Sequence, residues 1–169
     1  MTLRLADPGT LLSTTHEVDD GLRVRLRLAR PSDAMLMEAF FDELSDEPRA
    51  IRDFTFFNPR ERLVMVAAAM TGHSEEIVGV ADVVLLDTAV AELGAVVHDS
   101  RQGVGIGKLL TEAIASLALR QGASHLRAEL DGDQRMLALM RRLGPTMLTA
   151  EGETSVAVTR LPATRRRAA

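Results

Sequence analysis

Three glycines at alternate positions, in the stretch HDSRQGVGIGKLL (residues 98–110), constrain the fold of this chain more than any other feature. An apolar strand pattern ends just before them at Val97, and an apolar helical pattern begins just after them. Each glycine inside a helix or strand costs roughly 0.5–1 kcal/mol relative to alanine, so this loop is expected to need its bare backbone. Free amides in such a turn, together with the positive end of the following helix, can hold a pyrophosphate without a metal.

The spacing of the glycines excludes two common phosphate-binding motifs. The dinucleotide fingerprint G-x-G-x-x-G would need a third glycine where Lys108 or Leu110 stands. The P-loop would need a glycine in place of Gln102 and a hydroxyl side chain in place of Leu109. A third pattern, Q-x-x-G-x-G, is matched in full by residues 102–107. The alternative to phosphate binding is that the glycines form a structural turn, which lets the helix pack closely on the strand.

Alternation and helical periodicity predict a mixed sheet with interspersed helices. Residues 22–28 alternate leucine or valine with arginine, which is typical of a half-buried strand. Ser32 is the expected N-cap of the helix that follows. Further strands are expected at residues 63–70, 77–86, 89–97, 124–130 and 154–161, and further helices at 49–57, 105–121 and 133–143. This order predicts an α/β fold whose middle is rich in hairpins.

One domain accounts for most of the chain. No linker or repeat divides residues 21–162, so we expect them to form a single domain. Residues 1–20 show no clear period and are expected to form a loosely held, flexible N-terminal arm. Residues 163–169 contain three consecutive arginines and are expected to form a disordered basic tail.

Composition narrows the classes of partner. The chain has 169 residues, 46% of them hydrophobic, and a net charge of −4, which argues against nucleic acid or an anionic membrane as a partner. Cysteine is absent, and the four histidines lack metal-ligand spacing, so no metal site is expected. No apolar run approaches the roughly 20 residues that span a bilayer. A cytoplasmic protein is the expectation.

The sequence AELGAVVHDSRQGVGIGKLL resembles the central acetyl-CoA-binding motif of the GNAT superfamily of N-acetyltransferases. RLARPSDAMLMEAFFDELS is similar to that family's first strand and helix, and DQRMLALMRRLG to its late helix. Within the superfamily the chain is most similar to bacterial Pat-like protein lysine acetyltransferases, which share a strand glutamate ten residues ahead of the glutamine and an arginine- and methionine-containing late helix. The resemblance implies the GNAT fold, a mixed, mostly antiparallel central sheet with helices on both faces and a splayed strand pair.

The resemblance also implies acetyl-CoA as the acetyl donor. The pyrophosphate would be held by the glutamine-glycine motif and the amides that follow, and the pantetheine arm would bond the main chain at the end of the 89–97 strand. A late acidic residue stands where relatives often carry an asparagine that orients the cofactor, although it could serve as a helix cap instead. The implied cofactor-binding residues are Val96, Val97, Gln102, Gly103, Val104, Gly105, Ile106, Gly107, Lys108 and Asp133.

Glu92 is the candidate catalytic residue. A lysine amine is mostly protonated at neutral pH, so direct acetyl transfer needs a general base. Strand alternation puts Glu92, Gly94 and Val96 on one face, and a glutamate on an otherwise apolar strand is expected to have its pKa raised by desolvation. The match to the Pat-like glutamate favours catalysis over the alternative, a charge at a strand edge that faces water.

The residue inventory favours direct transfer in a ternary complex. No cysteine can carry an acyl-enzyme intermediate, and no tyrosine can protonate the leaving thiolate. The expected acceptor is a protein lysine or a small amine, and an oligomer is possible. The competing hypothesis is a non-catalytic acyl-CoA-binding sensor or partner module that keeps the fold.

Overall fold

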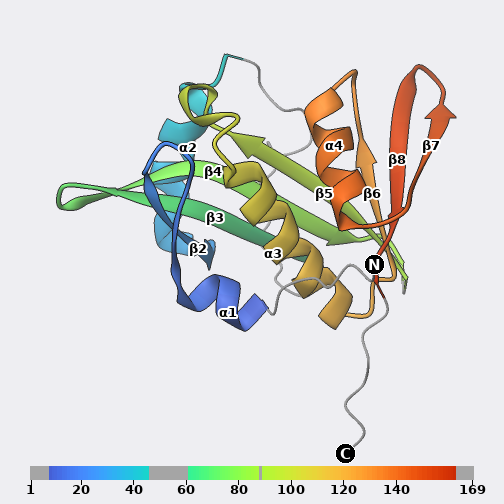
Figure 1. Cartoon of the computed structure of the whole chain (residues 1–169), viewed down its shortest axis with the longest axis horizontal. Helices are drawn as coiled ribbons and strands as arrows, with labels where there is room; N and C mark the ends of the chain where they lie inside the picture. Colours follow the sequence, from blue (N-terminus) through green and yellow to red (C-terminus); the bar gives the residue numbers. More distant parts are fainter. Residues whose placement is uncertain (1–7, 46–60, 88, 163–169) are drawn as a thin grey trace, which may run out of the picture.

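The computed structural model of the protein describes residues 8–45, 61–87 and 89–162. In these residues, strands form one eight-stranded sheet in the order β1-β2-β3-β4-β5-β6-β8-β7 (Figure 1). The strands are β1 (Thr15–Glu17), β2 (Arg23–Leu28), β3 (Arg62–Thr71), β4 (Ser74–Leu85), β5 (Val90–Val97), β6 (His125–Glu129), β7 (Thr146–Glu151) and β8 (Thr154–Arg160). The helices are α1 (Pro8–Ser13), α2 (Ala34–Asp42), α3 (Ile106–Arg120) and α4 (Gln134–Leu143), with short 3-10 turns η1 (Pro31–Asp33) and η2 (Asp99–Arg101).

The sheet is antiparallel at every pairing except the one between β5 and β6. These two parallel strands pair only from Val90 with His125 to Glu92 with Arg127. β5 continues to Val97 and β6 to Glu129 without further pairing between these two described strands. The pair is therefore splayed, and its open end lies beside the start of α3.

Helices cover both faces of the sheet. Along β3, Met65 and Ala67 belong to the large core that α1, α3 and α4 complete, whereas Val64 and Val66 pack with Phe40 of α2. In Figure 1, α1, α3 and α4 lie in front of the sheet and α2 lies behind it. The predicted architecture, a mixed and mostly antiparallel sheet with helices on both faces, is confirmed.

The alternating β2 strand matches its sequence pattern. Val24 and Leu26 are fully buried in the core on the α3 face. Arg25 is exposed on the opposite face, where α2 lies. Leu28, the last member of the apolar set, is 41% exposed because the strand ends there.

The start of α2 differs from the prediction. Asp33 occupies the N-cap position in place of Ser32. The Asp33 carboxylate accepts a hydrogen bond from the Arg30 amide at 2.6 Å and binds the Arg27 guanidinium through both oxygens at 2.7 and 2.8 Å. Arg27 lies on the preceding strand, so rules for helix caps, which consider only neighbouring residues, select Ser32 instead of Asp33.

Three elements lie where the sequence shows no period. Helix α1 and strand β1 fall in residues expected to form a loose arm, and Leu11 and Val18 of this segment are buried in the core. Strand β7 pairs with β8 at the sheet edge, where five of its six residues are exposed, so it has no apolar alternation. The predicted helix at 49–57 and the basic tail at 163–169 lie outside the described residues.

Candidate functional site

The glycine loop joins the end of β5 to the start of α3 and leaves a row of amides free. Gly103 and Gly105 have φ angles of 80° and 100°, in the left-handed region that side chains disfavour. Gly105 is the N-cap of α3, and the Leu109 amide donates to its carbonyl at 3.2 Å. The amides of residues 103–108 donate to no acceptor among the described residues, as expected for the first turn of a helix. The arrangement can bind a diphosphate.

Gln102 braces this loop. Its side-chain amide donates to the Val97 carbonyl at 3.3 Å and to the Asp99 carboxylate at 3.2 Å. The Arg135 guanidinium of α4 donates to the side-chain Oε1 atom of Gln102. The glutamine of the motif therefore ties the loop to β5 on one side and to α4 on the other.

The N-terminal segment holds the loop from a third side. The Asp19 amide donates to the Val104 carbonyl at 3.1 Å, and Arg101 forms an ion pair with Asp20 at 3.0 Å. Ile106 is buried under the first turn of α3, whereas Lys108 is exposed. Sequence reasoning missed the contribution of residues 19 and 20, because a contact more than 80 positions away leaves no local pattern.

Val96 and Val97 lie on the unpaired part of β5. On one side they pair with Val80 and Gly79 of β4. On the other side, within the described strands, β6 has already diverged. Their edge can therefore accept an extended, amide-bearing chain as an added strand.

Asp133 caps α4. Its carboxylate accepts hydrogen bonds from the amides of Arg135 at 2.8 Å and Met136 at 3.2 Å. These hydrogen bonds are those of a helix cap, which was the alternative to a role in orienting the cofactor.

Glu92 faces the α2 side of the sheet, beside a guanidinium. Arg127, its register partner on β6, donates to the Glu92 carboxylate and also to Glu151 of β7 at 2.7 Å. The side chain of Glu92 is 37% exposed. The expectation of an apolar setting for this carboxylate is not met, because the parallel pairing brings in a charged residue 35 positions away. The carboxylates of Glu151, Glu92 and Glu129 raise the pKa of Arg127.

A second carboxylate shares this face of the sheet. Asp82 of β4 pairs in register with Gly94 of β5, so it points to the same side as Glu92. It is only 4% exposed, and the Nε and Nη2 atoms of Arg62 both lie 2.8 Å from its Oδ2 atom. Burial raises the pKa of Asp82 to about 6, Arg62 opposes the rise, and Glu92 adds to it. The sequence signal was a lone aspartate in the apolar run EIVGVADVVLL.

Neither a metal-binding cluster nor a membrane-spanning helix occurs in the part of the chain that the structure describes. No group of three or more acidic or histidine side chains there is arranged to bind a metal ion. None of the helices described has the length and apolar character needed to cross a bilayer.

Comparison with protein families and curated proteins gives one match. The model of the acetyltransferase (GNAT) family matches residues 32–144, which span α2, the glycine loop, α3 and α4. No curated protein sequence matches the chain significantly.

Solved structures with the same fold are numerous but distant in sequence. The GNAT domain of S. lividans PAT has a TM-score of 0.72 at 21% identity, covering 88% of this chain and 96% of that one. A cAMP-binding acyltransferase from Mycobacterium smegmatis has a TM-score of 0.64 at 24% identity, and the match covers 95% of this chain but only 51% of that one. The yncA protein of Salmonella typhimurium, solved with its cofactor acetyl-CoA, has a TM-score of 0.61 at 17% identity over 86% of this chain and 96% of that one.

Proposed function

Because the chain belongs to the acetyltransferase (GNAT) family, we propose that it moves an acetyl group from acetyl-CoA to an amine. The observation that carries the proposal is the left-handed backbone at Gly103 and Gly105, in a loop whose amides are free and which directly follows the unpaired end of β5. The amides of residues 103–108 would hold the pyrophosphate, and the β5 edge at Val96 and Val97 would bond the pantetheine arm. Gln102 and Asp133 would act by holding the loop and α4 in place.

We propose Glu92 as the general base. The amine nitrogen attacks the thioester carbonyl, its proton passes to the Glu92 carboxylate, directly or through a water, and the carbon–sulfur bond breaks to release the thiolate. No cysteine exists to form an acyl-enzyme, which supports direct transfer in a ternary complex. A free thiol has a pKa near 8.5, so the thiolate can leave without a protein acid.

We propose a protein lysine as the acceptor and the cytoplasm as the location. The glutamate ten residues before the glutamine, typical of the Pat-like group that the sequence resembles, supports a protein lysine. A small amine is the alternative acceptor. Residues 21–162 are proposed as the catalytic unit, with residues 8–20 packed onto it.

The Glu92→Gln variant tests the base. Acetyl-CoA binding, measured by calorimetry, should persist, while turnover at pH 7 should fall by roughly 10²-fold or more. The Glu129→Gln variant is the matched control, because Glu129 lies 3.5 Å from the same Arg127 guanidinium. Near-normal turnover of Glu92→Gln, or an equal loss in Glu129→Gln, would contradict the base assignment.

A second candidate function is a non-catalytic acyl-CoA-binding module. The contact between Arg127 and Glu92 favours it, because the Glu92 carboxylate already has a guanidinium partner that an acceptor amine would have to displace. Release of free thiol from acetyl-CoA, followed against a panel of lysine peptides and small amines, separates the two functions. Binding without thiol release across the panel would support the module.

A further inference from the structure

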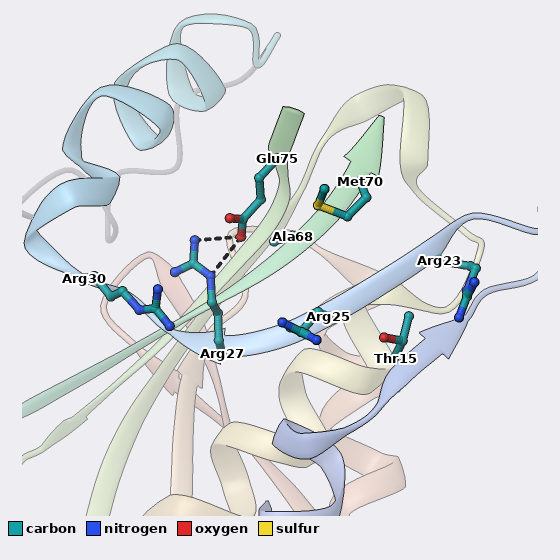
Figure 2. Close-up of a pocket in the computed structure, with 8 residues that line it drawn as sticks. All are labelled: Thr15, Arg23, Arg25, Arg27, Arg30, Ala68, Met70 and Glu75. Atoms are coloured by element: carbon teal, nitrogen blue, oxygen red, sulfur yellow. Dashed lines mark hydrogen bonds and ion pairs between the residues drawn. The ribbon is translucent and has the colours of Figure 1, made fainter. Parts of the chain in front are cut away.

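Four arginines follow one another along a groove at the β2 end of the sheet (Figure 2). The groove has a volume of about 570 Å³. Its lining, called here the arginine groove, consists of Thr15, Arg23, Arg25, Arg27, Arg30, Ala68, Met70 and Glu75. A chain with a net charge of −4 thus gathers positive charge on one surface.

The four arginines fall into two groups. Arg27 is structural, because it pairs with Asp33 at 2.7 Å and with Glu75 at 2.8 Å. Arg23, Arg25 and Arg30 are exposed, and none of them forms an ion pair with a residue that the structure describes. Three guanidiniums therefore face solvent beside one that is already neutralised, which is the arrangement of a surface that receives carboxylates.

The groove lies on the same face of the sheet as Glu92. Arg25 pairs with Ala68 of β3, and Ala68 pairs with Ile77 of β4. The side chains of these residues point to the face of the sheet that also carries Asp82 and Glu92. Glu92 is three strands away and about six residues further along, so the two sites are roughly 25 Å apart at 4.8 Å per strand and 3.3 Å per residue. A typical interface patch of about 800 Å² spans this distance.

We propose that the arginine groove binds an acidic, extended segment of the acceptor protein while a lysine of that protein reaches Glu92. Arg23 and Arg25 lie two residues apart on β2, so their side chains are roughly 7 Å apart, as are alternate side chains of an extended peptide. The floor adds Ala68 and a Met70 side chain that is 61% exposed, which suits the methylenes of glutamate better than a sugar-phosphate backbone. The row of separate guanidiniums also differs from a phosphate site, where donors converge on one point.

This inference rests on the proposed function. It determines the peptide substrate that the test requires. Helix α2 packs on Val66 and Val80 between the two sites, so the bound peptide must pass around this helix. The probe peptide therefore carries one lysine, a neutral flexible spacer of about 16 residues, which reaches roughly 50 Å, and a segment of alternating glutamates. Its partner peptide replaces the glutamates with glutamines. The test variant is Arg23→Glu with Arg25→Glu, and the charge-matched control is Arg141→Glu with Arg142→Glu, at the far end of α4 on the opposite face.

The wild type should show a KM for the acidic peptide that is roughly tenfold lower than for the neutral one, with kcat unchanged. This preference should vanish in the Arg23/Arg25 variant and at high salt, and it should persist in the Arg141/Arg142 control. Equal KM values for the two peptides, or loss of the preference in both variants, would overturn the proposal.

A binding measurement separates this proposal from the catalytic one. Fluorescence anisotropy of the acidic peptide with its lysine replaced by alanine should show binding to the wild type and not to the Arg23/Arg25 variant, even if no acetyl transfer occurs. Competition by inorganic phosphate or a single-stranded oligonucleotide as effective as that by the unlabelled peptide would assign the groove to phosphate and overturn the acidic-peptide assignment. Failure of the proposed function alone would leave this binding intact.

Discussion

Arg127 on β6 donates a hydrogen bond to Glu92 on β5, and the same guanidinium binds Glu151 of β7 at 2.7 Å. Parallel register puts Arg127 and Glu92 directly side by side. One cation with an 18% exposed side chain therefore holds carboxylates from two other strands, including the proposed base. Its removal would leave those carboxylates to repel one another.

The Arg127→Met variant should lower the free energy of unfolding at pH 7 by about 1–2 kcal/mol, because it removes the shared cation from Glu92 and from the exposed Glu151. Urea denaturation measures the loss. A double-mutant cycle with Glu92→Gln isolates the pair, and we expect a coupling energy of about 1 kcal/mol or more. A coupling energy near zero would mean that the contact between Arg127 and Glu92 contributes nothing.

Periodic elements of this fold were predictable from sequence because local patterns encode them. The alternation of β2 reflects one face buried in the core, and α3 follows a loop whose glycines adopt left-handed angles. Those features depend on residues a few positions apart, which a single sequence displays.

The charged part of the site was not predictable from sequence, because it depends on residues that are far apart in the chain. Glu92 meets Arg127, and Asp82 meets Arg62, only after strands distant in sequence are set side by side. The apolar neighbours of Glu92 within its own strand suggested an apolar environment. In the structure, the adjacent strand β6 places the Arg127 guanidinium beside this carboxylate. Strand β7 was missed because an edge strand has no buried face to leave a pattern.

Asp82 should make the stability of the protein depend on pH. Burial raises the pKa of Asp82 to about 6, above its ordinary value of 3.8, so the folded state binds this proton more tightly than the unfolded state. The stabilisation is fully present below pH 4 and is lost as pH rises through 6. Relative to Asp82→Asn, the wild type should lose roughly 3 kcal/mol between pH 4 and pH 7, at about 1.4 kcal/mol per pKa unit. Urea denaturation of both proteins across this range measures it, and parallel stability curves would contradict it.

The Gly105→Ala variant should weaken acetyl-CoA binding at least tenfold. Alanine at a φ of 100° is strained by about 1–3 kcal/mol, and relief of that strain would turn the amides of the loop away from their common direction. Gly72→Ala is the matched control, since Gly72 has a φ of 68° in the turn between β3 and β4. Calorimetry with acetyl-CoA should show the loss in Gly105→Ala alone. An equal loss in both variants would show that general destabilisation, rather than loop geometry, sets the affinity.

The Gly144→Ala variant should destabilise the fold by about 2–4 kcal/mol. A Cβ atom at Gly144, the C-cap of α4, would collide with the backbone carbonyl oxygen of Arg160, the last residue of β8. A backbone atom in the sheet cannot move aside as a side-chain tip can, so the strain must shift α4 or β8. Pro145→Ala is the control, because Pro145 is exposed and its carbonyl would still accept the hydrogen bond from the Arg160 amide at 2.9 Å. Thermal unfolding should separate the two variants by several degrees, and equal melting temperatures would show that the sheet adapts at this crossing.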